Sequence, residues 1–371
     1  MQRERNRRRI MRTQNTMAAR ATFAALNAYK LNGVKESNIE LGHGSYATVM
    51  ELEYMGLKCA GKRIHEVLLK QGDTSYTVLR FAEECRLLSQ IRHPNIVQFL
   101  GVYFQRGVKA PILVMEFLPT NLTSCIERHG ILDEEISYSI LHDVALGLNY
   151  LHSQTPPIIH RDLSSNNILL TANMTAKISD LGVARILNLT PQQVSRMQMS
   201  ATPGTPTFMP PEVMVASPVY NTSVDEFSYG ILMIHIFSGR WPEPQIPQTR
   251  MEAGKLVGVT EAERREALLR DIANDHPLKD LILKCINNEP KLRVHAGEII
   301  QRLREMLVRF PASFANRLEM LRYIRIEREQ ERCLREELDR RADQIIKKEL
   351  EISNLKKLLE DILATKQKVC N

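Results

Sequence analysis

Closely spaced cysteines are missing from this 371-residue sequence. None of its six cysteines belongs to a C-x-x-C pair, and none lies near a histidine at a spacing that suits a metal. They are Cys59, Cys85, Cys125, Cys285, Cys333 and Cys370. This usage excludes a disulfide-stapled fold and a zinc module, and it indicates a reduced, intracellular compartment.

Long apolar runs are missing as well. The most apolar stretch, at 229–237 (YGILMIHIF), contains a histidine and is far shorter than the roughly 20 residues of a membrane-spanning helix. The Arg-rich N-terminus has no apolar segment of the kind that a secretory signal carries. We therefore expect neither a transmembrane segment nor a secretory signal, and we expect a cytoplasmic protein.

The positive charge is confined to one end of the chain. The formal net charge is +7, and residues 1–12 alone hold six Arg and one Glu, whereas residues 41–310 carry a net charge of −1. We interpret 1–35 as a basic arm that is disordered or partly helical, with an Ala-rich stretch at 17–30. A solvated tail, a nuclear-localisation signal, an RNA- or membrane-binding patch and a mitochondrial presequence remain open for this arm. Nucleic acid is not an expected partner of the body.

In the body, residues 36–310, the spacing of apolar residues changes once, from strand-like to helical. Period-2 alternation broken by glycine turns predicts strands within 36–64, and further strand-like runs occur at 96–104 and 112–117. Apolar residues at helical spacing predict a helix over 77–92, which Pro94 ends. Beyond about 120 the pattern is mainly helical. The sequence therefore predicts an α+β fold with a small β-rich lobe and a larger α-helical lobe.

The C-terminal segment, 311–371, lacks glycine and tryptophan and is crowded with charges of both signs. In one heptad frame, ten of the sixteen a and d positions between Arg317 and Val369 are apolar. This pattern favours a coiled coil that joins two copies of the chain or binds another protein. Because Arg341 and Lys348 occupy d positions, a long solvated helix that packs back on the body remains open.

Three features of the β-rich half suit a phosphate ligand. Gly42 and Gly44 lie between two predicted strands, where glycines let backbone N–H groups approach phosphate oxygens. Lys62 lies on the following strand and can act as a point charge for phosphates. Glu84 lies on the next helix, from which its carboxylate can hold Lys62. Taken alone, each feature is more often an ordinary hairpin turn or a solvated surface residue.

The string His160-Arg161-Asp162-Leu163-Ser164-Ser165-Asn166-Asn167 changes that balance. Asp180-Leu181-Gly182 and Pro210-Pro211-Glu212 follow it in order. With these motifs, residues 36–310 resemble a eukaryotic protein kinase of the tyrosine-kinase-like group. The resemblance implies a bilobal fold, ATP and Mg²⁺ as cofactors, and a protein substrate.

The resemblance also implies a role for individual residues. Asp162 would be the catalytic base, Lys62 would hold the phosphates while paired with Glu84, and Asp180 and Asn167 would bind the metal. The residues that would surround the nucleotide are Leu41, Gly42, Gly44, Val49, Ala60, Met115, Glu116, Leu118 and Leu169. Leu88, Phe99, His160 and Leu181 would form an apolar column, and Glu212 would pair with Arg293.

Regulation and acceptor specificity are further implications. Arg161 beside Asp162 is typical of kinases that activation-loop phosphorylation switches on, and Thr202 is our hypothesis for that site. Thr205 is expected to be structural and to face Asp162. The P-P-E ending favours Ser/Thr acceptors, although Ser164 fits neither the usual Ser/Thr nor the usual tyrosine pattern. A tyrosine or dual-specificity kinase and a pseudokinase scaffold are the alternatives.

Overall fold

The computed structural model describes residues 26–44, 47–65, 74–105, 111–181, 185–186, 205–213, 221–242, 249–252, 255–258, 263 and 267–310. The chain divides into two units, Met1–Arg309 and Phe310–Asn371. The Arg-rich run at 1–12, Thr202 and the heptad segment at 313–369 lie outside the described residues, so the predictions made for them stay predictions.

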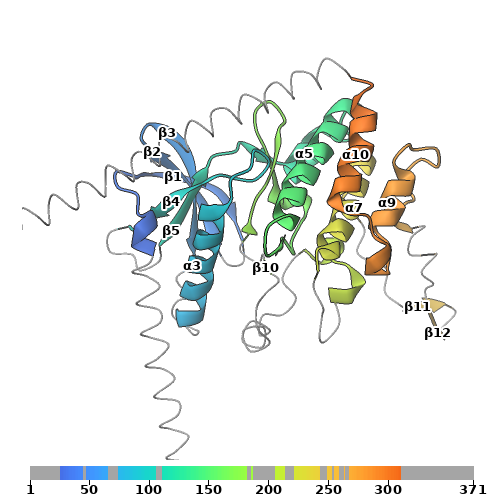
Figure 1. The fold of residues 1–371 in the computed structure, drawn as a ribbon, viewed down its shortest axis with the longest axis horizontal. Helices are drawn as coiled ribbons and strands as arrows, with labels where there is room; N and C mark the ends of the chain where they lie inside the picture. Colours follow the sequence, from blue (N-terminus) through green and yellow to red (C-terminus); the bar gives the residue numbers. More distant parts are fainter. Residues whose placement is uncertain are drawn as a thin grey trace, which may run out of the picture. The chain divides into compact units, whose positions relative to one another are not determined.

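A five-stranded antiparallel sheet forms the first part of the structure (Figure 1). Its strands are β1 (Lys35–His43), β2 (Ala47–Tyr54), β3 (Leu57–Ile64), β4 (Phe99–Tyr103) and β5 (Ile112–Glu116). They are arranged in the order β1-β2-β3-β5-β4, which leaves β1 and β4 at the two edges. All the strands predicted from alternation are therefore present.

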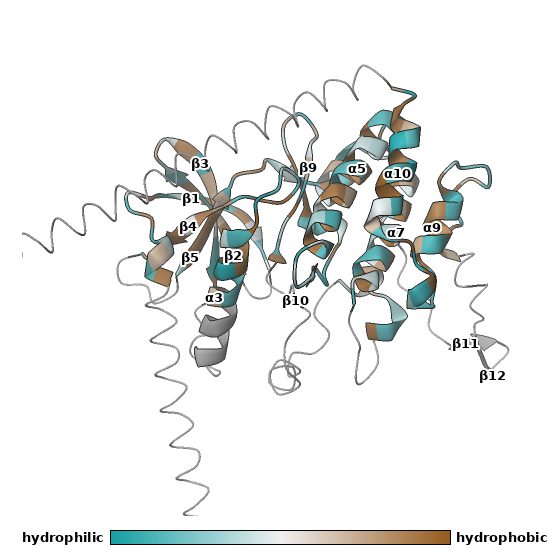
Figure 2. Cartoon of the chain, in the orientation of Figure 1, coloured by the Kyte–Doolittle hydropathy of each residue, from teal (hydrophilic) through white to brown (hydrophobic). Residues whose placement is uncertain are grey.

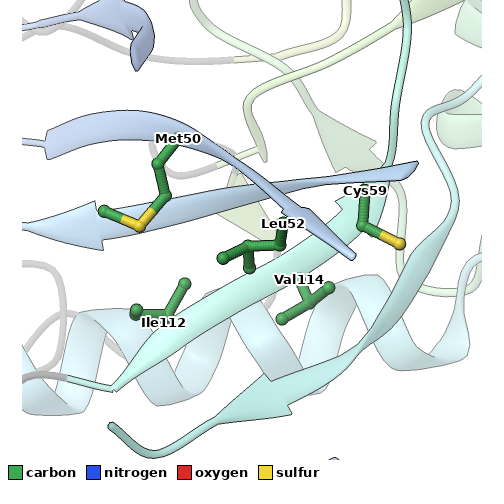
Figure 3. Packing of buried hydrophobic residues seen from close by; sticks show 5 residues of the cluster. All are labelled: Met50, Leu52, Cys59, Ile112 and Val114. Atoms are coloured by element: carbon green, nitrogen blue, oxygen red, sulfur yellow. The ribbon is translucent and has the colours of Figure 1, made fainter. Parts of the chain in front are cut away.

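A tight turn and an apolar cluster explain why β2 and β3 pair. Met55 and Gly56 connect them with φ of 51° and 81°, the left-handed pair that matches the twist of a two-residue hairpin. The alternating pattern then buries Met50 and Leu52 on one face of the sheet. Figure 3 shows these two side chains in one cluster with neighbours from β3 and β5, namely Cys59, Ile112 and Val114.

Helix α3 (Thr74–Gln90) lies against β4 (Figure 1). It buries Phe81, Cys85 and Leu88, whose spacing of three and four residues places them on one face. The nearly buried Glu84 lies beside Cys85 on this helix. The predicted helix is thus confirmed, and it carries the carboxylate that the sequence analysis singled out.

Helices dominate the second part, as predicted. The helices of four or more residues are α4 (Leu122–His129), α5 (Glu134–His152), α7 (Ser223–Ser238), α9 (Lys279–Cys285) and α10 (Ala296–Leu307). The short helical turns are η2 (Ser165–Asn167), η4 (Pro206–Phe208), η5 (Pro211–Val213) and η6 (Pro290–Leu292). The small strands are β6 (Thr120–Asn121), β7 (Ile158–Ile159), β8 (Ile168–Leu170), β9 (Ala176–Ile178), β10 (Arg185–Ile186), β11 (Thr249–Glu252) and β12 (Lys255–Gly258).

Burial separates two kinds of helix in this part. The apolar run at 229–237 lies in α7, which is buried along almost its whole length and forms the centre of the helical core. Helix α10 instead alternates apolar and polar residues, as its mixed colouring shows in Figure 2, and it buries Ile299 and Leu303 while packing on α5. Among the helices that the structure describes, none is both long and apolar enough to span a bilayer.

A close backbone approach links the helical part to the segment after α3. A Cβ on Gly147 of α5 would lie 2.8 Å from the carbonyl oxygen of Asn95 and 2.9 Å from Cδ1 of Ile178. The Ile178 N–H donates to that same Asn95 oxygen at 2.8 Å, and Val97 N–H donates to the Ile178 oxygen at 2.9 Å. Strand β9, which leads to Asp180, is therefore attached to the loop that follows α3.

The last residues of the predicted arm lie against the sheet. Residues 26–34 were assigned to the basic arm, but the structure packs them against the sheet. Leu26 is buried, Asn27–Tyr29 form the short turn η1, and Leu31 and Val34 pack on the apolar cluster of Figure 3. Charge counting could not detect this, because the contacts depend on a few apolar side chains rather than on the charge of the segment.

Candidate active site

Strand β3 and helix α3 bring Lys62 and Glu84 together, and Asp180 joins them. Lys62 Nζ donates to Glu84 Oε1 at 2.9 Å and to Asp180 Oδ1 at 2.8 Å. Burial alone would lower the pKa of Lys62, but the two carboxylates outweigh it and raise that pKa above its ordinary value. The ammonium is therefore charged at neutral pH and held between two elements far apart in sequence.

Asp180 follows β9 and has an unusual backbone. Its φ of 57° lies in the left-handed region, which few non-glycine residues adopt. Its side chain is 44% exposed, whereas Lys62 and Glu84 are nearly buried. The carboxylate at the end of β9 is thus the accessible member of the ionic group and can meet a ligand.

The loop that begins at His160 presents a second carboxylate, Asp162. Its Oδ1 accepts hydrogen bonds from the Thr205 N–H at 2.8 Å and from the Thr205 hydroxyl at 3.1 Å. Its Oδ2 and its carbonyl oxygen both accept from Asn167 Nδ2, at 3.0 Å and 2.8 Å. Asp162 is therefore held at both side-chain oxygens, and the expectation that Thr205 faces it is confirmed.

Asp225, in the first turn of α7, anchors the start of this loop. Its carboxylate accepts the N–H groups of His160 and Arg161 and a hydrogen bond from His152, each at 2.8 Å. Burial raises the pKa of this carboxyl, but the His152 contact and the other donors lower it further, so the net shift is downward. Arg161 can keep its left-handed φ of 71° because Asp225 satisfies the backbone around it.

The side chains of His160 and Asn167 are oriented by their partners. His160 Nε2 donates to the Ser179 carbonyl at 2.8 Å, and its Nδ1 accepts from the Asp162 N–H, which defines the ring tautomer. Asn167 uses its amide nitrogen for both contacts with Asp162, so neither contact engages its amide oxygen. That oxygen remains for another ligand.

The donor set at this place fits a hard divalent cation. Asp180 contributes a carboxylate and Asn167 an amide oxygen, and oxygen is the ligand that Mg²⁺ prefers. Within the described residues, no group of three or more His, Cys, Asp or Glu side chains is arranged to hold a metal alone. Two protein oxygens with phosphate oxygens completing the shell is the usual arrangement for Mg²⁺.

All the predicted nucleotide residues except Leu169 lie on the five-stranded sheet or in the segments directly after its strands. Gly42 is at the end of β1, opposite Val49 of β2, and the Gly44 N–H donates to the Ala47 carbonyl at 2.9 Å. In the ladder between β3 and β5, Ala60 is opposite Met115. The remaining predicted residues are Leu41 on β1, Glu116 at the end of β5, Leu118 after it, and Leu169 on β8.

Three contacts of this region were not predicted from the sequence. Lys177 of β9 donates to both carboxylate oxygens of Glu116 at 2.7 Å, and the Gln98 N–H donates to one of them at 2.7 Å. His65, just after β3, contacts the Gly44 carbonyl at 2.8 Å through Nε2. The only sequence signal was a lysine inside a short strand and a histidine three residues after Lys62, which does not identify a partner.

The remaining structural expectations can be compared directly. Arg293 makes a two-pronged ion pair with Glu212, with Nη2 at 2.8 Å from Oε2, and it also donates to the Ser223 carbonyl. The predicted pair is confirmed. The residues expected in the apolar column are all buried, namely Leu88, Phe99, His160 and Leu181.

The fold and the site together define a class of protein. A five-stranded antiparallel sheet with one helix carries a Lys–Glu pair, and a helical part supplies the His160–Asn167 loop and Asp180. This is the architecture of the protein kinase fold. The family model for the protein kinase domain matches residues 36–303, so the chain belongs to the protein kinase family.

Curated relatives agree with this family. The chain is 33% identical over 270 residues to the probable serine/threonine-protein kinase SIS8 of Arabidopsis thaliana, covering 72% of this chain and 24% of that protein. It is 31% identical to serine/threonine-protein kinase 12 of the same plant, over 72% of this chain and 55% of the relative. It is also 33% identical to the dual specificity protein kinase shkC of Dictyostelium discoideum, over 74% and 52%. The chain thus spans between about a quarter and about half of these relatives.

Proposed function

We propose that this chain is an ATP-dependent protein kinase that transfers the γ-phosphoryl group to serine and threonine hydroxyls of a protein. The observation that carries the proposal is Asp162, held by Asn167 and Thr205, in the same unit as the Lys62 ammonium bound to Glu84 and Asp180. Phosphoryl transfer depends on positioning and charge neutralisation, and this set supplies both.

Different residues would bind the cation and the nucleotide. Asp180 and Asn167 would hold Mg²⁺, which would supply positive charge to neutralise the phosphates. Lys62 adds a fixed positive charge for the α- and β-phosphates. The ion pair with Glu84 restricts the movement of the lysine side chain. Val49, Ala60 and Leu169 would contact the adenine, and the backbone from Glu116 to Leu118 would bind its edge.

Asp162 is the proposed base. Its carboxylate can accept the proton of the acceptor hydroxyl, or orient that hydroxyl toward the phosphorus. The hydrogen bonds to Oδ1 and Oδ2 restrict the rotation of the carboxylate, so the acceptor meets it in one orientation. Such preorganisation is what a positioning mechanism requires.

Serine or threonine is the proposed acceptor, and a tyrosine or dual-specificity kinase is the second candidate. SIS8 and kinase 12 are named serine/threonine kinases, whereas shkC is named dual specificity. Ser164, two residues after the proposed base, is buried and uncharged, so it adds no positive charge next to Asp162. Phosphoamino-acid analysis of the product distinguishes the two candidates directly.

A pseudokinase scaffold is disfavoured by the same contacts. A scaffold does not need a lysine that is paired with two carboxylates, nor a held aspartate whose asparagine neighbour keeps an oxygen for a metal. All five polar residues are present and each makes at least one of the contacts expected of it: Lys62, Glu84, Asp162, Asn167 and Asp180.

The test is phosphate incorporation from Mg-ATP into a generic protein substrate. We expect Asp162→Asn and Asp180→Ala each to abolish almost all incorporation, while Asp275→Asn, at an exposed aspartate, stays at the wild-type level. Equal incorporation by wild type and both site variants would reject the catalytic assignment. Binding of Mg-ATP without transfer by any of them would favour the scaffold.

The proposal includes two features outside the described residues. Phosphorylation of Thr202 would activate the enzyme through Arg161, because a phosphate carries about two negative charges that an arginine can bind. Mass spectrometry of active protein and the Thr202→Ala variant test this. Pairing of 313–369 would hold two copies together, and a monomer in sedimentation of the whole chain would refute it.

A further inference from the structure

A segment that precedes the matched kinase domain is built into the small lobe. Residues 26–34, hereafter the strap, come before residue 36, where the family match begins. Leu26 at its start is only 1% exposed, and Leu31 and Val34 pack on the apolar cluster of the sheet. Figure 1 draws the start of the strap as the dark-blue turn beside the sheet.

The strap covers the edge of the sheet. Strand β4 is the outermost strand of the order β1-β2-β3-β5-β4, so its outer N–H and C=O groups need partners. Lys30 forms a parallel bridge to Val102, and the Leu31 N–H donates to the Val102 carbonyl at 2.8 Å. The chain itself thus occupies an edge that would otherwise be open.

The surface of β4 is shaped for this contact. A Cβ on Gly101 would lie 2.6 Å from Cγ of Leu31 and 2.7 Å from the carbonyl oxygen of Tyr29. No side chain other than hydrogen can stand there while the strap is in place. A glycine next to Val102 therefore supports the docked position independently of the hydrogen bonds.

Tyr29 connects the strap with α3. Its ring meets the ring of Phe99 edge-on, with centroids 5.7 Å apart, and its hydroxyl is hydrogen-bonded to Ser89 Oγ at 3.2 Å. Ser89 lies in the last turn of α3, five residues after Glu84. The strap thus contacts both β4 and the helix whose carboxylate holds Lys62.

We propose that the strap is a positioning element of the kinase, with Tyr29 as its positioning residue. By holding the C-terminal end of α3 against β4, it keeps Glu84 within hydrogen-bond reach of Lys62. Without it, α3 has more freedom to move away from β3, and Lys62 loses a carboxylate that orients it. The effect on turnover rests on the proposed function, whereas the effect on α3 does not.

Hydrogen exchange of the whole chain tests the structural part without reference to catalysis. In Tyr29→Ala we expect the amides of residues 81–90 to exchange at least about fivefold faster, because local opening of α3 becomes easier, while those of α5 are unchanged. Tyr29→Phe, which keeps the ring against Phe99 but removes the hydrogen bond to Ser89, should exchange at a rate between those of wild type and Tyr29→Ala. Unchanged exchange over 81–90 in Tyr29→Ala overturns the proposal, whatever the enzyme does.

A double-mutant comparison tests the link to Glu84. We expect Tyr29→Ala to lower kcat about fivefold in the wild-type background and less than about twofold when Glu84→Gln is already present, since the contact that it protects is then gone. The exposed Met55, at the tip of the β2–β3 hairpin, supplies the control Met55→Ala, which should not change kcat. Equal losses in both backgrounds would show a general loss of stability and refute the positioning role.

A substitution in β4 can also displace the strap from the sheet. Gly101→Ala places a methyl group where Leu31 and Tyr29 lie, so we expect it to reproduce the faster exchange of Tyr29→Ala over 81–90. Gly297→Ala is the matched control, because the nearest atom to its added Cβ is 3.9 Å away. Protection in Gly101→Ala equal to that of wild type would contradict the docked position of the strap.

Discussion

Thr205 and Asp162 are joined by two hydrogen bonds to a single oxygen. The Thr205 N–H and hydroxyl both donate to Asp162 Oδ1, at 2.8 Å and 3.1 Å. Thr205 lies directly before the turn η4, so this contact attaches the end of the chain that leads into η4 to the proposed base. The hydroxyl can be removed while the N–H stays, which separates the two contributions.

We expect Thr205→Val to lower kcat about tenfold, because hydrogen bonds to charged groups contribute about 1.5–3 kcal/mol and this one orients the base. Thr205→Ser, which keeps the hydroxyl, should stay within about twofold of wild type. Steady-state kinetics with a peptide substrate measure both. Full activity in Thr205→Val would mean that the backbone N–H alone holds Asp162.

Asp225→Asn should reduce the free energy of unfolding at pH 7 by about 2–4 kcal/mol, because one of its buried acceptor oxygens becomes a donor that faces other donors. Urea unfolding followed by circular dichroism measures the loss. Asp280→Asn, at an exposed ion pair with Arg302, should cost no more than about 0.5 kcal/mol. Similar losses in both variants would contradict the anchoring role of Asp225.

The stability difference between wild type and Asp225→Asn should depend on pH. The pKa of Asp225 is lower in the folded protein than in the unfolded chain, where an aspartate has a pKa of about 3.9. Its stabilising contribution is therefore present above that unfolded value and is lost as the pH falls through the folded value. We expect the difference between wild type and Asp225→Asn to be constant from about pH 6 to 8 and to shrink below about pH 4.

The residues in local motifs could be placed from the sequence. Asp162 and Asn167 are close because they belong to one eight-residue string, and the alternation around Lys62 predicted its strand. The contact between Thr205 and Asp162 was expected from the family resemblance and is present. In each case the contact could be predicted either from the spacing of residues within one motif or from the order of the motifs along the chain.

Contacts between single residues from distant elements could not be placed. Nothing near Lys177 identifies Glu116 as its partner, and nothing near Gly101 shows that residues 29–31 will cover it. Such pairs depend on how two elements pack, and each involves one or two side chains without periodicity. The strap was missed for this reason, since a nine-residue segment with three buried or packed apolar residues has no repeating pattern.

Gly147→Ala tests the close approach between α5 and the loop after α3. The added Cβ would lie 2.8 Å from a backbone oxygen of Asn95, which cannot rotate away. We expect a loss of about 1–3 kcal/mol in the free energy of unfolding, although alanine favours helices by about 1 kcal/mol over glycine. Thermal and urea unfolding measure it. Gly297→Ala in α10 has room and should be neutral or stabilising, so a gain in both variants would contradict the packing.

The contact between His65 and Gly44 predicts a role in nucleotide affinity. His65 Nε2 lies 2.8 Å from the Gly44 carbonyl, and its ring lies 4.9 Å, centroid to centroid, from that of His43 in the same glycine turn. If Gly42 and Gly44 cover the phosphates, releasing this turn weakens ATP binding more than it slows transfer. We therefore expect His65→Ala to raise KM for ATP about threefold and to change kcat less than about twofold, since a neutral hydrogen bond contributes about 0.5–1.5 kcal/mol.

His65→Gln separates the hydrogen bond from the ring. The glutamine amide can donate to the Gly44 carbonyl, so KM for ATP should return toward the wild-type value if the hydrogen bond holds the turn. If the packing of His65 on His43 holds it instead, the glutamine variant should behave like His65→Ala. His129→Ala, at an exposed histidine at the end of α4, serves as the control and should leave both constants unchanged. A fall in kcat with constant KM for ATP in His65→Ala would place its effect on the transfer step and contradict the role in binding.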